Sequence, residues 1–121
     1  LEKLRRAEES LGAAVAAKGL KAAYLEALAE SGRVHRDEHE PMVGREPGVS
    51  LLDSRRTAVT WNVVEAKVAS SADLGYAYGT GEARLADGSV EKFAFLRIWE
   101  PDSKQVWRIV LDIENPIPVE K

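Results

Sequence analysis

The sequence contains no cysteine. A chain without thiols has no disulfide framework, no thiolate zinc site and no cysteine nucleophile, so its stability must come from packing. Cysteine-free proteins occur on both sides of membranes, and the composition therefore leaves the compartment undecided. Because the chain begins at Leu1 rather than at a methionine, we expect a trimmed N-terminus, and loss of an export signal is one explanation of it.

Long apolar runs and an excess of positive charge are also missing. No run approaches the roughly 20 apolar residues that cross a bilayer, so we expect a soluble chain that makes no membrane contact. The 17 basic residues are spread among 20 acidic ones, which leaves no basic stripe for phosphates, and we expect no nucleic-acid partner.

Several catalytic motifs are absent as well. The sequence has no glycine-rich phosphate loop, no G-x-S-x-G elbow and no H-E-x-x-H helix, which argues against several large enzyme classes. We expect the protein to work without a cofactor.

Of the 121 residues, enough for one domain, the first third has helical periodicity. Apolar residues including Leu4, Leu11 and Val15 recur at three- and four-residue spacing, which predicts an amphipathic helix. Gly19 interrupts the pattern, and a second helix is predicted to end at a cap formed by Ser31 and Gly32. The helical part therefore covers about residues 1–32.

A loop and a short helix are predicted over about residues 33–56, the helical turn at Val49–Arg55. From about residue 57 to 116 the period changes to two, with β-branched and aromatic residues. The predicted strands are Ala58–Ser70, Leu74–Leu85, Val90–Glu100 and Val106–Glu114. Their short connections make neighbours antiparallel. The fold class is α+β, with N-terminal helices packed on a strongly curved antiparallel sheet, in one domain.

Three strand segments carry a family resemblance. Residues Ala72–Gly79, the pair Ile98-Trp99 and residues Val106–Ile113 resemble the uncharacterised bacterial branch of the nuclear transport factor 2-like superfamily, also called SnoaL-like or ketosteroid isomerase-like. The resemblance implies a cone-shaped fold, a homodimer formed through the sheet, and a pocket between the helices and the concave sheet face. It implies no single reaction, because such proteins include isomerases, dehydratases, cyclases, epoxide hydrolases and binding modules.

Asp112 is the candidate general base. It lies among Val110, Leu111 and Ile113 on the last predicted strand, and apolar surroundings raise the pKa of a carboxyl. The alternative is an aspartate at the strand edge, solvated or paired with Arg97 or Arg108.

Other residues are candidate proton donors. Tyr76 and Tyr78 point the same way along one strand and could donate hydrogen bonds to a developing oxyanion, although tyrosines in a strand are more often packing residues with a solvated hydroxyl group. His35 is a candidate acid or base at the mouth of the pocket. His39 lies four positions after His35, a spacing found in some metal sites, but the charged stretch before Pro41 favours a surface loop, and no metal is predicted.

The candidate ligand-binding residues are mostly aromatic. They are Tyr24, Trp61, Tyr78, Arg97 and Trp99. Arg97 alternates with Phe93, Phe95 and Trp99 on one strand face, where it could bind a carboxylate or stack on Trp99. The same face could instead be an exposed or dimer-forming surface.

Two functions follow from these patterns. One is a small-molecule pocket with cofactor-free acid/base chemistry on a carbonyl-bearing or cyclic substrate, and the other is a non-enzymatic module whose aromatic sheet face pairs with itself or another protein. Strand parity separates them, because a shift of one residue exchanges Phe93, Phe95, Arg97 and Trp99 for the residues between them.

Overall fold

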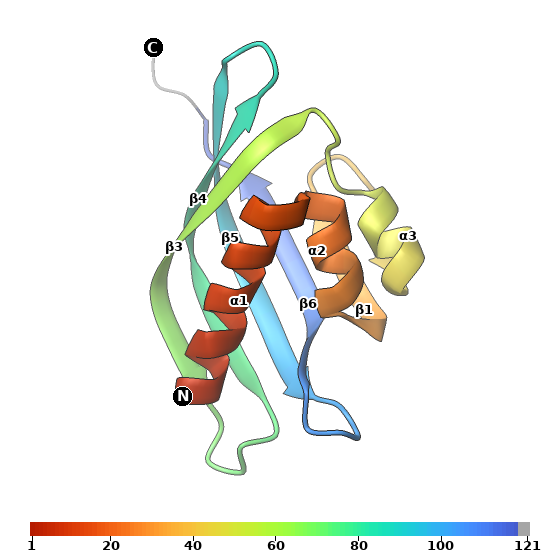
Figure 1. Cartoon of the computed structure of the whole chain (residues 1–121), viewed down its shortest axis with the longest axis vertical. Helices are drawn as coiled ribbons and strands as arrows, with labels where there is room; N and C mark the ends of the chain where they lie inside the picture. Colours follow the sequence, from red (N-terminus) through yellow and green to blue (C-terminus); the bar gives the residue numbers. More distant parts are fainter. Residues whose placement is uncertain (119–121) are drawn as a thin grey trace.

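The change of sequence period near residue 57 coincides with the start of β3 (Arg56–Val68), the first strand of the antiparallel meander. The computed structural model describes residues 1–118. Its elements are α1 Glu2–Lys18, α2 Leu20–Ala27, β1 Leu28–Arg36, β2 Met42–Val43, α3 Arg45–Ser50, β3 Arg56–Val68, β4 Gly75–Leu85, β5 Val90–Pro101 and β6 Trp107–Pro116 (Figure 1). The predicted class, α+β with helices on an antiparallel sheet, is confirmed.

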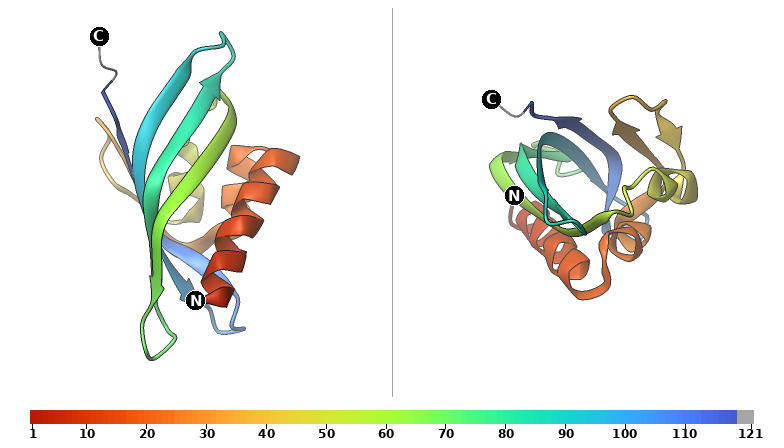
Figure 2. Two further views of the ribbon diagram at one scale, coloured as in Figure 1. Left: turned by 90° about the vertical axis from the view of Figure 1, so that its left-hand side faces the viewer. Right: turned by 90° about the horizontal axis from the view of Figure 1, so that it is seen from above.

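The four long strands pair as sequence neighbours in one sheet of six strands. The strand order is β2-β1-β6-β5-β4-β3. Strands β3 to β6 form an antiparallel meander, as the short connections predict. The sequence analysis missed β1, which runs parallel to β6. The sheet is curved and twisted, and it does not close on itself (Figure 2).

The second helix ends earlier than predicted. Ser31 and Gly32 do not cap α2, which stops at Ala27, but lie within β1 where the register with β6 shifts. A Cβ atom at Gly32 would stand 2.8 Å from the carbonyl oxygen of Ile109. Gly32 therefore permits the close approach of β1 to β6 at an irregularity, and the prediction of a helix cap there is wrong.

The short helix is real but begins before its predicted range. Helix α3 covers Arg45–Ser50 instead of Val49–Arg55. Pro47 is tolerated because it lies in the first turn, where the missing N–H would have no helical partner. Leu52, just beyond the helix, is 3% exposed and belongs to the core.

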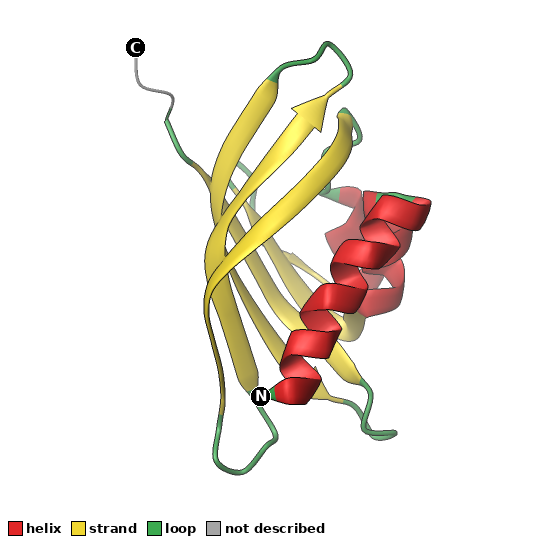
Figure 3. Ribbon diagram, turned by 60° about the vertical axis from the view of Figure 1, so that its left-hand side comes forward, coloured by secondary structure: helices red, strands yellow, loops and turns green. Residues whose placement is uncertain are grey.

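Helices α1 and α2 cover the concave face of the sheet and leave the convex face bare (Figure 3). The core between the two layers contains Leu4, Leu11, Tyr24, Phe93 and Trp99. None of the helices among residues 1–118 is both long and apolar enough to cross a membrane.

Strand β4 turns its smallest side chains toward the helices. Ala77 and Ala83 are fully buried, and Gly81 lies opposite Phe93 in the register. A Cβ atom at Gly81 would stand 2.3 Å from the Phe93 ring. The large side chains of β5 therefore fill the concave side over a floor of glycine and alanine.

Candidate functional site

The strand register decides which residues share the concave face. Arg97 on β5 lies opposite Ala77 on β4 and Asp112 on β6, and directly opposed residues of an antiparallel pair point to the same face. Phe93, Phe95, Arg97 and Trp99 therefore face the helices, and each is at most 5% exposed. The outward-facing alternative is wrong for these four.

Arg97 organises the centre of this face. Its guanidinium donates from Nε to Asp112 Oδ2 at 2.9 Å, from Nη1 to Glu8 Oε1 at 2.6 Å and from Nη2 to the Tyr24 hydroxyl at 3.0 Å. The Tyr24 hydroxyl donates in turn to Asp112 Oδ2 at 2.8 Å. Helices α1 and α2 thus supply two partners and β6 the third, so the cluster fastens the helical layer to the sheet.

The pairing continues toward the open end of the cone. Arg36 Nη1 lies 2.8 Å from Asp112 Oδ1 and its Nη2 lies 3.7 Å from Glu114 Oε2. Arg56 Nη2 lies 2.7 Å from Glu114 Oε1, and its Nε lies 3.4 Å from Glu91 Oε1. Acids and bases therefore alternate without a break. We call this set the ion chain: Glu8, Arg97, Asp112, Arg36, Glu114, Arg56 and Glu91.

Aromatic rings enclose the inner end of the ion chain. The Arg97 guanidinium carbon lies 4.8 Å from the ring centre of Phe95 and 4.9 Å from that of Trp61. Trp99 Nε1 donates to Glu8 Oε2 at 2.7 Å, so this carboxylate joins the indole to Arg97. Stacking on aromatic rings favours a desolvated guanidinium, and these side chains occupy the centre of the concave face.

The surroundings of Asp112 lower its pKa. Burial alone would raise the pKa, but the charges of Arg36 and Arg97 and the hydrogen bonds from Arg97 and Tyr24 outweigh it and hold the pKa below its ordinary value. The expected raised pKa is wrong, because Asp112 contacts two guanidinium groups on a face that its apolar sequence neighbours do not share. Burial, the largest effect, raises the pKa of Tyr24, whose hydroxyl stays protonated.

Five of the eight candidate site residues gather around the ion chain. These are Asp112, Arg97, Tyr24, Trp61 and Trp99. The geometry brings them together as a packed cluster, with Asp112 1% exposed and Arg97 fully buried. The weighed alternative for Asp112, an ion pair with Arg97, is the arrangement observed.

The other three candidates lie on the convex face. Tyr76 and Tyr78 pair with Ile98 and Leu96 on β5, and His35 pairs with Ile113 on β6. The sheet separates all three from Asp112, so they do not share a site with it.

The two convex tyrosines form a pair of their own. Their rings stack 6.3 Å apart, and the Tyr76 hydroxyl donates to Glu65 Oε2 at 2.9 Å. This hydrogen bond is the main reason why the pKa of Tyr76 is raised. The Tyr76 hydroxyl is therefore already hydrogen-bonded within its own chain. It lies on the face of the sheet opposite to α1 and α2 (Figure 3).

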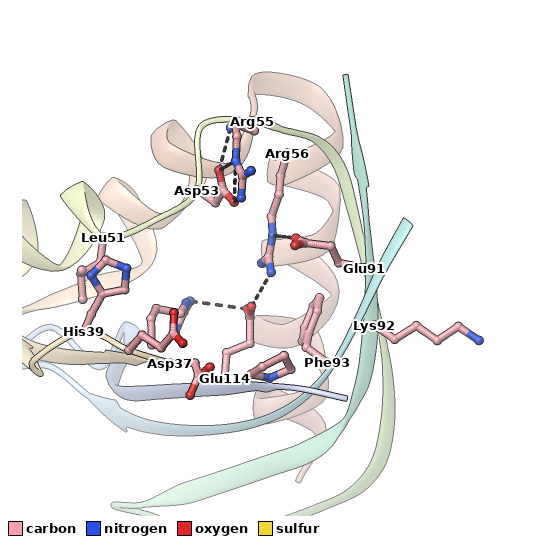
Figure 4. A pocket seen from close by; sticks show the side chains of 13 residues that line it. Asp37, His39, Leu51, Asp53, Arg55, Arg56, Glu91, Lys92, Phe93 and Glu114 are labelled. Carbon is pink, nitrogen blue, oxygen red and sulfur yellow. Dashed lines mark hydrogen bonds and ion pairs between the residues drawn. The ribbon is translucent and has the colours of Figure 1, made fainter. Parts of the chain in front are cut away.

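A polar pocket lies where the ion chain reaches solvent, at the mouth of the cone. It encloses about 270 Å³, and we call it the mouth pocket. Arg36, Arg56, Glu91, Phe93 and Glu114 are among its lining residues. In Figure 4 the Arg56 side chain extends between Glu91 and Glu114, whereas Lys92 points away. Arg36, Arg56 and Glu114 side chains are 8–11% exposed, so the charges at the floor are largely desolvated.

Known proteins resemble this chain in structure and not in sequence. No family model and no curated protein sequence matches this chain. A ketosteroid isomerase-like protein from Erwinia carotovora atroseptica superposes with a TM-score of 0.80 at 16% identity, over 98% of this chain and 97% of that chain. A nuclear transport factor 2-like protein with a cystatin-like fold from Novosphingobium aromaticivorans gives 0.70 at 16% identity, over 98% and 82%. An LEH-like epoxide hydrolase from M. tuberculosis gives 0.66 at 14% identity, over 96% and 84%.

The chain has the nuclear transport factor 2-like fold. All three structures superpose on at least 96% of this chain with TM-scores of 0.66 to 0.80. At these identities the likeness establishes the fold, and the chemistry has to be argued from the residues present.

In this nuclear transport factor 2-like domain the sequence analysis missed most of the ion chain. Glu8 had a visible signal, because it interrupts the apolar stripe between Leu4 and Leu11 and so faces the core. The sequence signal for Arg36 and Glu114 was weaker. Arg36 lies two positions after the buried Val34, and Glu114 lies two positions after the buried Asp112, so strand alternation places both on the buried face.

Metal ligands are not clustered in the described part of the domain. Residues 1–118 contain no group of three or more His, Asp or Glu side chains placed to hold an ion. His35 lies on β1 while His39 lies in the turn that follows, so the two do not share a helix face.

Proposed function

We propose that this domain binds a small polar molecule in the mouth pocket. The observation that carries the proposal is the pair of largely desolvated guanidinium groups, Arg36 and Arg56, on either side of Glu114 at the floor of a concave surface. A volume of about 270 Å³ lies near the lower end of the range for ligand pockets, roughly 300–1,000 Å³, and suits a small ligand.

The charges of the pocket indicate the kind of ligand. Guanidinium groups bind carboxylates in a planar, bidentate way, while Glu91 and Glu114 accept hydrogen bonds from ammonium or hydroxyl groups. Phe93 supplies an apolar wall and carries Arg56 above its ring at 5.0 Å. These groups together favour a compact carboxylate that also bears a donor, such as an amino or hydroxy acid.

Binding is better supported than proton abstraction at Asp112. Asp112 is buried, accepts hydrogen bonds from Arg97 and Tyr24, and has a lowered pKa. A general base must reach its substrate and release its own partners to take a proton. We infer that Asp112 stabilises the interior, and that acid/base chemistry on a carbonyl-bearing or cyclic substrate would need a group at the mouth pocket.

The test is a thermal-shift screen with amino acids, hydroxy acids and matched neutral amides, followed by calorimetry. Carboxylates should raise the melting temperature, and the Arg56→Met variant should lose at least about tenfold in affinity, as expected for removing a buried ionic contact. Arg84→Met is the matched control, because Arg84 is exposed and does not line the pocket. The proposal fails if no compound binds or if Arg56→Met binds as well as the control.

The convex face supports a second function, homodimerisation through the sheet. Tyr78 and Leu74 are 40% and 41% exposed, and a groove of about 530 Å³ is lined by Leu74, Leu96 and Ile98 among others. Contiguous apolar surface of this kind marks protein contacts. The aromatic residues Phe95 and Trp99, expected to form such a face, point inward, so the contact surface would consist of tyrosine and aliphatic side chains.

A further inference from the structure

A second concave surface lies between α1 and α2, remote from the mouth pocket. It encloses about 430 Å³ and is lined by both helices, by Trp99 and by the segment Gln105–Arg108. We call it the helix groove. The proposed function, which concerns the mouth pocket, does not use it.

The groove exists because the facing positions of the two helices carry small side chains. Ala7 and Ala14 of α1 face Ala23 and Ala27 of α2, and all four line the space. Trp107 forms part of its floor and is only partly buried. Alanine methyl groups leave a gap that larger side chains would fill, and an indole supplies a broad apolar surface with one polar edge.

The rim of the groove is positively charged. Its charged lining residues are Lys3, Arg6, Arg108 and Glu26, three cations and one carboxylate, although the whole chain has a net charge of -3. Glu26 Oε2 already pairs with Lys18 Nζ at 2.5 Å, and Arg108 Nε already pairs with Asp102 Oδ2 at 3.2 Å. Lys3 forms no ion pair with the residues that the structure describes.

Arg6 is also available to a ligand. Its contact with Glu2 is 3.4 Å long, and the two side chains are 77% and 84% exposed. Such a pair contributes little, so an anion that brings an apolar body into the groove could take its place.

We propose that the helix groove binds an amphipathic anion, a slim or flat apolar molecule with one terminal carboxylate or sulfonate. The apolar body lies on Trp107 and the alanines, and the anionic group lies at Lys3 and Arg6 on the first two turns of α1. The volume of about 430 Å³ falls within the range of small-molecule sites. Apolar burial and charge complementarity thus select the same class of molecule.

The probe is decanoate, with decanol as its neutral counterpart, titrated into the whole chain below the micelle concentration and followed by calorimetry and tryptophan fluorescence. Decanoate should bind saturably with one molecule per chain. The Ser10→Phe variant, at an exposed residue that lines the groove, should weaken decanoate and decanol about tenfold by filling the space.

Charge reversal separates this site from other apolar surfaces. Lys3→Glu with Arg6→Glu should weaken decanoate about tenfold and leave decanol unchanged, since only the ionic contact is lost. The matched control is Arg5→Glu with Lys21→Glu, which changes the net charge equally at exposed residues outside the groove. Circular dichroism verifies that each variant folds.

Three results would overturn the proposal. They are an absence of saturable binding, equal weakening by the control pair, and loss of binding in Leu96→Glu, which would place decanoate on the convex face. The Arg56→Met variant should bind decanoate normally, so failure of the mouth pocket and failure of the helix groove are distinguishable.

Discussion

The sequence neighbours of Asp112 and its spatial neighbours predict opposite shifts of its pKa. Its neighbours in the chain are apolar, whereas its neighbours in the fold are Arg36, Arg97 and Tyr24. Strand alternation is the cause, because adjacent residues of β6 face opposite sides of the sheet. The contacts across the concave face therefore decide the protonation of Asp112.

We predict that Asp112→Asn destabilises the protein by about 3–5 kcal/mol at neutral pH, because it removes the buried carboxylate that Arg36 and Arg97 share. The pKa of Asp112 is depressed below its ordinary value of 3.8. Its contribution is therefore present above that value and is lost as the pH falls through the lower, folded pKa. Urea unfolding along a descending pH series should show the difference between wild type and variant narrowing in acid.

The control for this prediction is Glu82→Gln. Glu82 lies 3.9 Å from Lys92, and both side chains are more than half exposed, so its loss should cost less than about 1 kcal/mol. A gap between wild type and Asp112→Asn that stays constant with pH would contradict a stabilising role for the ionised Asp112 carboxylate.

At the scale of elements, β4 shows how small residues make room for large ones. Its inward positions carry Gly75, Ala77, Gly79, Gly81 and Ala83, and the inward positions of β5 carry aromatic residues and Arg97. Alternating small and large side chains across neighbouring strands let the concave face fill without clashes.

Gly81→Ala should destabilise the protein by about 1–3 kcal/mol, the usual cost of overpacking a core, because the new methyl group would stand 2.3 Å from the Phe93 ring. Gly12→Ala is the matched substitution. Gly12 lies within α1 and has nothing within 4 Å of an added Cβ atom, so alanine there should stabilise by about 0.5–1 kcal/mol. Urea midpoints for the two variants should move in opposite directions, and a shift in the same direction would refute the packing argument.

At the scale of the whole molecule, all three helices and the ion chain lie on one side of the sheet. The convex face carries Tyr76, Tyr78, Leu96 and Ile98, and no helix formed by residues 1–118 covers it. An exposed apolar sheet face is unfavourable in a monomer, which supports the proposed homodimer.

Light scattering across a broad dilution series should give twice the mass of one chain at high concentration. Leu96→Glu should then shift the protein to monomer, because it would bury a carboxylate in an apolar contact. Leu25→Glu on α2 is the control, since Leu25 is exposed, at 45%, on the helical side. A wild-type protein that stays monomeric at every concentration would rule out the dimer.

The sequence alone determined α1, the start of α2, the meander and hence the class of fold, since periodicity and turn residues act locally along the chain. The sequence analysis also named most of the aromatic residues around Arg97 and Glu8, among them Tyr24, Trp61 and Trp99. Glu8 was detectable as a charge within an apolar stripe, but its partners Arg97 and Asp112 are far from it in the chain.

Only the tertiary structure decided strand parity, the parallel pairing of β1 with β6, and the ion chain. Parity depends on register, which contacts between distant strands fix. The ion pairs Glu8–Arg97 and Arg36–Asp112 join residues that lie far apart in the chain. Nothing in the local sequence around these residues distinguishes them from solvated surface charges. The buried, low-dielectric surroundings that strengthen the attraction between Arg97 and Asp112 exist only after the helices have packed on the sheet.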